Sequence, residues 1–312
     1  VCAHLDTVFD GSVSHRVERE TDRLVGPGIG DNARGLAAML AIVDALHVTG
    51  VRTRRPLLFA ATTGEEGAGN LRGARHLFAT SASGAHAAVA LDGAGDDRVV
   101  THALGTRRYR VTYRGAGGHS WASYGTPNAV HAAASLAATL AAWPLPGLPF
   151  TTLSVCRIGG GSAVNAIPGD AWLEIDVRST RAADISRLDE RIRRTAERCG
   201  DAENLRSGDG GRQALRLEID TTGDRPGGAL SGDEVLGHMA FEATRLIGRV
   251  PASAVASTDA NVPLALGIPA IALGGGGVGG DAHTTREWYE NRDGALGIAR
   301  VLTVVVSVAG LA

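Results

Sequence analysis

The chain has 312 residues, a length that suggests one large domain or two ordinary ones with a core that is stable unaided. Its 31 basic residues nearly balance its 33 acidic residues and neither sign forms a long block, which argues against a nucleic-acid partner and against an anionic membrane. Three cysteines lie far apart without C-x-x-C spacing, so we do not expect a disulfide framework. We expect a cytoplasmic location, where thiols stay reduced. A small polar substrate fits this composition best.

No run of 18 apolar residues occurs, so the sequence predicts no membrane-spanning helix. The chain opens with "VCAHLDTVF", which has the pattern of a strand. This opening predicts that an N-terminal segment precedes the first residue.

The first third of the chain alternates between strand and helix patterns. Apolar runs at 55–63 and 86–94 are bounded by turn residues and indicate buried strands, whereas 35–50 has the length and spacing of a helix. The same alternation returns after about residue 222, with a helix near 231–247, the apolar run 267–275 and a last apolar segment. We therefore expect an α/β/α domain with a mixed, largely parallel sheet.

A different pattern interrupts this domain. Alternating apolar and polar residues at 107–115 predict a half-exposed strand, and the elements that follow give the order β-α-β-β-α-β, typical of a ferredoxin-like α+β domain. The predicted elements after the first strand are a helix at 127–142, strands at 151–159 and 171–179, a helix at 182–198 and a strand at 213–220. We expect three segments: 1–102 and 222–312 form the catalytic domain, and 103–221 is inserted in it.

Polar side chains that can bind metal follow the predicted strands. In "AHLDTV", His4 and Asp6 lie two apart, so both leave one face of the sheet and Asp6 is placed to orient His4. Glu65 and Glu66 follow the strand "PLLFAATT", where a metal ion would offset their repulsion and leave one acid as ligand and its neighbour as general base. Asp92 follows the next strand. The alternatives are a pair at a strand end for His4 and Asp6, a surface pair for Glu65 and Glu66, and an ordinary loop acid for Asp92.

Two glycine-rich segments complete the candidate set. "GPGIGDNARG" places Asp31 before a helix, where it is either an N-cap or part of a metal loop, and it lacks the G-K-[ST] of a phosphate loop. The later segment "GGGGVGGDAHTTREW" ends in His283 and contains Gly275 and Gly276, whose N–H groups can approach a substrate carboxylate or oxyanion. A floppy surface loop is the alternative for this second segment.

As a set, these side chains supply two imidazoles and three carboxylates at the loop ends of one sheet edge: His4, Asp31, Glu66, Asp92 and His283. That set suits two divalent ions that share a bridging carboxylate, the arrangement of two-metal hydrolases. Two Zn²⁺ ions are the predicted cofactors, with Co²⁺ or Mn²⁺ as alternatives because affinity alone does not select the metal.

The motifs, in this order, resemble the zinc-dependent metallopeptidase family of aminoacylase, carboxypeptidase G, peptidase T and succinyl-diaminopimelate desuccinylase. The resemblance rests on "HLDTV", "GPGIGDNARGLAAML", "TTGEEG", "ALDGAG", "GGHS", "NAIPGDAWLEIDVRS" and "AHTTREW", and covers nearly the whole chain. It implies an α/β/α catalytic domain with an inserted ferredoxin-like lid that commonly forms a homodimer.

The resemblance also implies roles for single residues. His4 and Asp92 would bind one zinc, Glu66 and His283 the other, and Asp31 would bridge them. Glu65 would be the general base, and Asp6 would be the acid that orients His4. In the lid, His119 would steady the oxyanion in the partner subunit's site, and Asn165 and Arg178 would contact the substrate.

Two departures from the family pattern bear on function. Asn32 stands where many members have a second Asp, and Asp92 stands where deacetylase-like members often have Glu, which favours a peptidase. We therefore predict a dinuclear zinc hydrolase of a small peptide or N-acyl amino acid. The alternatives are a deacylase, desuccinylase or ureido-amidohydrolase of the same family, and a truncated member that binds metal or peptide without turnover.

Overall fold

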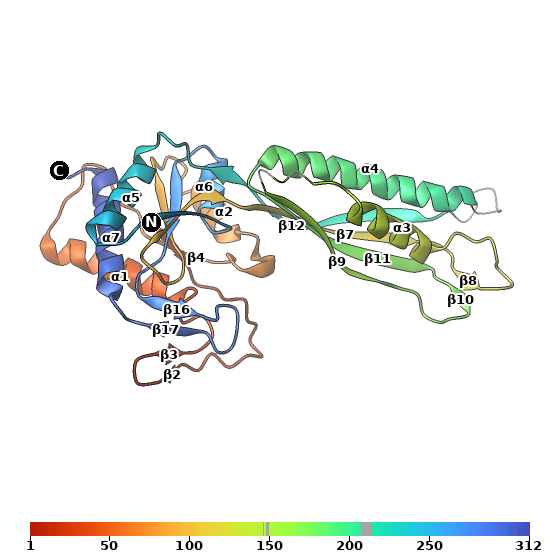
Figure 1. The fold of residues 1–312 in the computed structure, drawn as a ribbon, viewed down its shortest axis with the longest axis horizontal. Helices are drawn as coiled ribbons and strands as arrows, with labels where there is room; N and C mark the ends of the chain where they lie inside the picture. Colours follow the sequence, from red (N-terminus) through yellow and green to blue (C-terminus); the bar gives the residue numbers. More distant parts are fainter. Residues whose placement is uncertain (146, 148–149, 207–213) are drawn as a thin grey trace. The chain divides into compact units, whose positions relative to one another are not determined.

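The computed structural model of the chain describes residues 1–145, 147, 150–206 and 214–312. The chain forms two compact units: the main unit, Val1–Leu104 with Arg225–Ala312, and the inserted unit, Gly105–Asp224. Figure 1 shows the ribbon of both. The last strand of the inserted unit continues past the expected boundary at residue 221, and Gln213, at the start of the strand expected over 213–220, lies outside the described residues.

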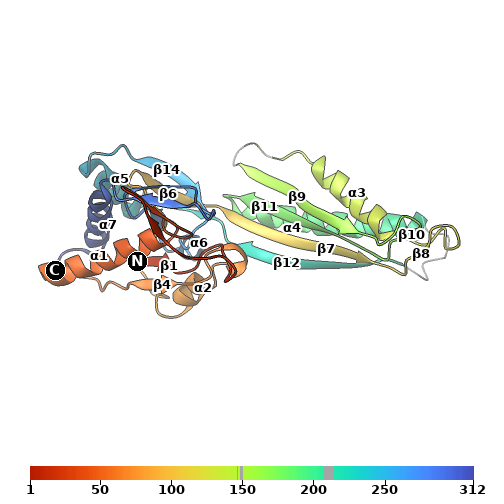
Figure 2. The same cartoon turned by 90° about the horizontal axis from the view of Figure 1, so that it is seen from below.

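A seven-stranded sheet forms the centre of the main unit. Its strand order is β13-β6-β15-β5-β1-β4, and β14 also pairs with β6, beside which it lies in Figure 2. The pairs β1–β4, β1–β5, β15–β5 and β14–β6 are parallel, whereas β6 runs antiparallel to β15 and β13. The mixed, largely parallel sheet is therefore confirmed. Its strands are β1 Cys2–His4, β4 Ala60–Thr62, β5 Ala88–Leu91, β6 Arg98–Ala103, β13 Gly228–Ala229, β14 Ala252–Ala256 and β15 Ala270–Leu273.

Helices cover both faces of this sheet because the strand side chains alternate between the faces. On one face, larger side chains such as Val89 and Ile271 pack against three long helices: α1 Ala33–Thr49, α5 Val235–Leu246 and α7 Gly294–Ala309. On the other face, small side chains such as Ala90 and Ala272 pack against two short ones: α2 Arg72–Ala79 and α6 Asn261–Ala265. This layering is the expected α/β/α arrangement, although α2 and α6 were not predicted.

A second, small sheet of the main unit was also not predicted. Its order is β16-β17-β3-β2, with β2 Glu18–Arg19, β3 Leu24–Val25, β16 Val278–Gly280 and β17 Trp288–Glu290. The glycine-rich segment after β15 is thus not a floppy loop, since β16 pairs with β17. These strands have two or three residues each, too few to show an alternating pattern.

The inserted unit follows the order β7-α3-β9-β11-α4-β12, and its sheet order is β12-β7-β11-β9. Strand β11 runs antiparallel to both β7 and β9. The bounds are β7 Gly105–Arg114, α3 Ala129–Ala141, β9 Thr151–Gly160, β11 Asp170–Ser179, α4 Ala182–Arg206 and β12 Arg216–Arg225, with a short ribbon of β8 Gly118–His119 and β10 Ala166–Ile167.

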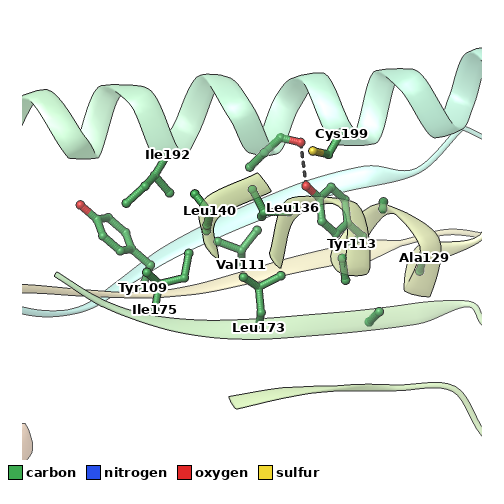
Figure 3. Packing of buried hydrophobic residues seen from close by; sticks show 14 of the residues in the cluster. Tyr109, Val111, Tyr113, Ala129, Leu136, Leu140, Leu173, Ile175, Ile192 and Cys199 are labelled. Atoms are coloured by element: carbon green, nitrogen blue, oxygen red, sulfur yellow. Dashed lines mark hydrogen bonds between the residues drawn. The ribbon is translucent and has the colours of Figure 1, made fainter. Parts of the chain in front are cut away.

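The core of the inserted unit lies between its sheet and its two helices (Figure 3). Alternate residues of β7 and β11, among them Val111 and Leu173, meet Leu136 of α3 and Ile192 of α4 there. The hydroxyl of Tyr113 donates a 2.7 Å hydrogen bond to the carbonyl of Ala196, drawn as a dashed line in Figure 3, so the one polar atom of this ring is satisfied inside the core.

Within the described ranges, none of the helices has both the length and the apolar character needed to cross a bilayer.

Candidate metal centre

The candidate residues meet at one edge of the main sheet. Strands β1, β4 and β5 run parallel, so their carboxyl ends reach the same edge. His4 is the last residue of β1, Glu65 and Glu66 follow β4, and Asp92 follows β5 directly. The sheet topology therefore brings together side chains that lie far apart in the sequence.

Asp31 lies between two histidines. Its Oδ1 is 2.9 Å from Nε2 of His4, and its Oδ2 is 3.3 Å from Nε2 of His283. Asp92 Oδ1 lies 4.0 Å from the His4 nitrogen, and Glu66 Oε1 lies 3.0 Å from the His283 nitrogen. Two sets of possible ligands result, His4–Asp31–Asp92 and Asp31–Glu66–His283, and within each the ligand atoms lie within 4.8 Å of one another. Asp31 belongs to both sets.

The atoms at the centre of the first set lack hydrogen bonds. Nε2 of His4 and Oδ1 of Asp31 are buried, and within the described part of the chain neither has a hydrogen-bond partner although they lie 2.9 Å apart. A proton on His4 that is shared with Asp31, or a divalent cation bound to both atoms, would satisfy this buried pair. The nitrogen and oxygen donors, and their number, fit two divalent ions of the zinc type.

Two oxygens of Asp6 lie near the ring of His4. Nδ1 of His4 is 2.9 Å from the main-chain carbonyl oxygen of Asp6 and 3.9 Å from its carboxylate. The carbonyl is the closer partner, and the role of the Asp6 carboxylate in orienting His4 stays a prediction. Because β1 ends at His4, Asp6 lies beyond the strand, and the two-residue alternation on which the prediction rested does not apply there.

The Asp6 carboxylate also holds the loop that carries Glu65 and Glu66. Its Oδ1 accepts the N–H groups of Gly64 at 2.7 Å and Glu65 at 3.2 Å, and its Oδ2 accepts that of Glu66 at 2.9 Å. Three main-chain donors on one carboxylate fix the direction in which these two glutamate side chains leave the backbone.

Asn32 connects the Asp31 loop to the Asp92 loop. Its side-chain amide donates to the carbonyl of Leu91 at 2.8 Å, and its Oδ1 accepts the N–H of Gly93 at 3.2 Å and that of Gly35 at 3.1 Å. A Cβ on Gly35 would lie 2.0 Å from this oxygen, so only glycine fits there. The peptide bond between Asp31 and Asn32 is cis. The Asn that departs from the family pattern is thus part of the site's frame.

Glu287 holds the Asp31 loop, a role that we did not predict. Its side chain is buried, and it accepts the N–H groups of Gly28 and Gly30 at 2.8 Å and that of Asp31 at 2.6 Å. Glu287 lies more than 250 residues from its partners, so no local pattern could have indicated the contact. Only its place in "AHTTREW" near His283 pointed to this region.

Replacing Glu287 with Gln is expected to lower the free energy of unfolding by about 1.5–3 kcal/mol, the usual value of hydrogen bonds to a buried charged group. The NH₂ group of the glutamine would face the N–H of Gly28 or Gly30, and two donors cannot form a hydrogen bond with each other. Denaturant unfolding of the metal-free protein measures the change. The control is Glu290→Gln in β17, three residues further along the chain, whose pairs with Arg23 and Arg292 are partly exposed and should contribute less than about 1 kcal/mol. Equal effects of the two substitutions would contradict the role of Glu287.

A family model described as peptidase family M20/M25/M40 matches residues 1–307. The chain belongs to this family. It is therefore a hydrolase of peptide or amide bonds from a metal-dependent family, and the resemblance inferred from the sequence motifs is confirmed. None of the curated proteins searched matches the chain.

Solved structures share the M20 fold with this chain. Aminopeptidase PepT from Bacillus cereus is 23% identical with a TM-score of 0.78, and a tripeptidase from Staphylococcus aureus is 22% identical with a TM-score of 0.75; each match covers 99% of this chain and 80% of the other. A dinuclear metal-binding M20 peptidase from Bacillus subtilis, YXEP, is 17% identical with a TM-score of 0.66, over 88% of this chain and 71% of the other.

Protonation in this M20 site reflects the crowding of acids. Burial alone would lower the pKa of His4, but Asp31, Asp92 and Glu65 raise it to about 10. Burial, followed by the charge of Asp31, raises the pKa of Asp92 to about 7. Burial, followed by the charge of Asp92, raises the pKa of Glu65 to about 9. The crowded acids hold protons at neutral pH because burial and the repulsion between their negative charges disfavour ionisation, and bound cations could replace these protons.

Metal binding at pH 7 is therefore expected to release at least one proton per chain. His4 is protonated in the metal-free protein at this pH and must lose that proton to act as a ligand. Because a raised pKa means that protons compete with the metal, affinity should rise with pH, and the release should be smaller at pH 8, where Asp92 is already ionised. Calorimetric titration with ZnCl₂ in two buffers of different ionisation enthalpy measures the proton number. Binding without proton release would contradict the expectation.

The glycines expected to contact substrate are used inside the M20 fold. The N–H of Gly275 donates to the carbonyl of Gly93 at 2.9 Å, and the N–H of Gly276 donates to that of Gly95 at 3.0 Å. Both glycines are buried, and a Cβ on Gly276 would lie 2.5 Å from the carbonyl oxygen of Gly294. These two N–H groups are not available to a substrate, and the glycines permit close packing of α7 against the loop instead.

The three remaining candidates lie in the inserted unit. Nδ1 of His119 accepts the N–H groups of Trp121 at 3.1 Å and Ala122 at 3.3 Å, so in the neutral ring the proton is on Nε2. The carbonyl of Asn165 accepts the N–H of Ser120 at 3.0 Å, next to His119. Arg178 donates from Nε to Asp176 at 2.7 Å. The structure thus places His119 and Asn165 side by side, and Arg178 in an ion pair.

Proposed function

We propose that the chain is a dinuclear zinc peptidase that cleaves an amide bond of a small peptide, with an N-acyl amino acid as the alternative substrate. The observation that carries the metal count is the position of Asp31, whose two carboxylate oxygens each lie near a different histidine. His4 and Asp92 would hold one ion, Glu66 and His283 the other, and Asp31 both. Co²⁺ or Mn²⁺ could occupy the same donors.

Bound divalent ions lower the pKa of water from roughly 15.7 to about 7 and polarise a carbonyl. Glu65 is the general base: it takes the proton of the attacking water and passes it to the leaving amine. Its position supports this role, because it is only 4% exposed and lies in a third group of possible ligand atoms with His4 and Glu66. Asp6 and Arg225 hold Glu65 from the backbone and the side chain, respectively.

Two observations support a peptide as the substrate. The aminopeptidase and the tripeptidase to which the chain is similar favour a peptide, and so does Asp92 in place of the Glu of deacetylase-like members. We further propose that the inserted unit is a lid that forms a homodimer and that His119, Asn165 and Arg178 contact substrate. An edge strand in this unit, β9, has many exposed residues and supports a pairing surface.

Metal analysis and a substrate panel test the proposal together. The purified protein should bind two Zn²⁺ per chain, and fewer than about one would refute the two-metal site. The loaded protein should then hydrolyse dipeptides or tripeptides faster than N-acetyl or N-succinyl amino acids. The reverse order would favour the deacylase or desuccinylase, and metal binding without turnover of any compound would favour a non-catalytic binding role. Size-exclusion chromatography with light scattering tests the homodimer.

A further inference from the structure

Arg225 is buried against the loop that carries Glu65. Its side chain is only about a tenth exposed, and NH1 donates to Oε1 of Glu65 at 3.2 Å and to Oγ of Ser257 at 3.1 Å. NH2 donates to the main-chain carbonyl oxygens of Glu65 and, at 3.5 Å, of Gly67. One guanidinium thus holds both the side chain and the backbone of the residue that we propose as the base.

These contacts bear on orientation more than on stability. A buried ion pair contributes little to stability on average, since desolvation offsets most of the attraction, but the planar fork of Arg holds its partners in one geometry. Arg225 contacts Oε1 of Glu65, which leaves Oε2 for the reaction. The carboxylate of Glu66 lies within 4.8 Å of that of Glu65 and would repel it, and the guanidinium of Arg225, which contacts Oε1 of Glu65, opposes this repulsion.

We propose that Arg225 is a positioning residue that holds Glu65 for catalysis. This inference rests on the proposed function of Glu65 as the base. It assigns Arg225 no contact with substrate.

The first test compares substitutions of Arg225 in the zinc-loaded protein. Arg225→Met should lower kcat by about 10- to 100-fold, part of the 10²–10⁴-fold that general base catalysis supplies, while KM and zinc content stay within about twofold. Arg225→Lys should retain more activity, and guanidinium ion should partly restore Arg225→Ala. The control is Arg245→Met, which removes an exposed pair with Glu242 on α5 and should leave kcat unchanged. An unchanged kcat in Arg225→Met, or a loss explained by lower zinc content, would overturn the inference.

A crystal structure of Arg225→Met gives a readout that does not depend on turnover. The carboxylate of Glu65 should move away from its position beside Asp92 and Glu66, and Arg225→Lys covers the case in which Arg225→Met does not fold. A Glu65 that stays in place overturns the positioning role whatever the activity. A displaced Glu65 in a protein whose parent, loaded with zinc, hydrolyses nothing in the panel would refute the proposed function and support the contact.

Discussion

Glu65→Gln is expected to lower kcat by about 100- to 10,000-fold while the protein still binds two metal ions. Glutamine has nearly the shape of glutamate and can still accept the hydrogen bond from Arg225 through its amide oxygen, so the loop should keep its conformation. It has no carboxylate with which to take a proton from water. Turnover of the best peptide and zinc content by mass spectrometry measure the two quantities on the same preparation.

The matched control for this substitution is its neighbour. Glu66→Gln removes a carboxylate that lies 3.0 Å from His283, and we expect it to lower zinc content as well as activity. The two substitutions alter adjacent residues on one loop and differ in their effect on metal. If Glu65→Gln lost metal like Glu66→Gln, or kept full activity, the division between base and ligand would be wrong.

Topology made the centre of this site predictable from the sequence. Parallel strands end at the same edge of a sheet, so acids or histidines just after β1, β4 and β5 had to lie near one another. The structure brings His4, Glu66 and Asp92 together in this way. Asp31 and His283 come from loops, and their motifs rather than strand periodicity indicated where they belong. The α/β class followed from the same alternation of apolar runs and helical spacing.

The supporting contacts could not be predicted because they depend on distant pairs and on backbone direction. Glu287 and Arg225 contact residues that are more than 150 positions away in the chain. The contacts of the Asp6 carboxylate with the Gly64–Glu66 loop were missed for another reason, since β1 ends at His4 and the alternation of a strand does not describe Asp6. The glycines at 275 and 276 contain no side chain whose chemistry could distinguish packing from substrate contact.

Asp31→Asn is expected to weaken the binding of both metal ions, because this carboxylate is the one that faces both histidines. An amide keeps one oxygen and turns its NH₂ toward one of the two positions, where a donor repels a cation. The loss of affinity should exceed the roughly 10- to 100-fold that follows from changing residues outside the ligand shell, and turnover should fall with it. Competition with a zinc chelator measures both affinities.

The control for Asp31 is Asp281→Asn, an exposed acid near His283 whose left-handed backbone conformation, with φ of +56°, Asn also tolerates. It should leave both affinities unchanged. If Asp31→Asn weakened the binding of one ion only, the two sets of ligands would not share this residue, and the site would consist of two independent metal positions. Because Glu287 holds the main-chain N–H of Asp31 and not its carboxylate, the loop should survive the substitution, and a loss of both ions would report on the bridge itself.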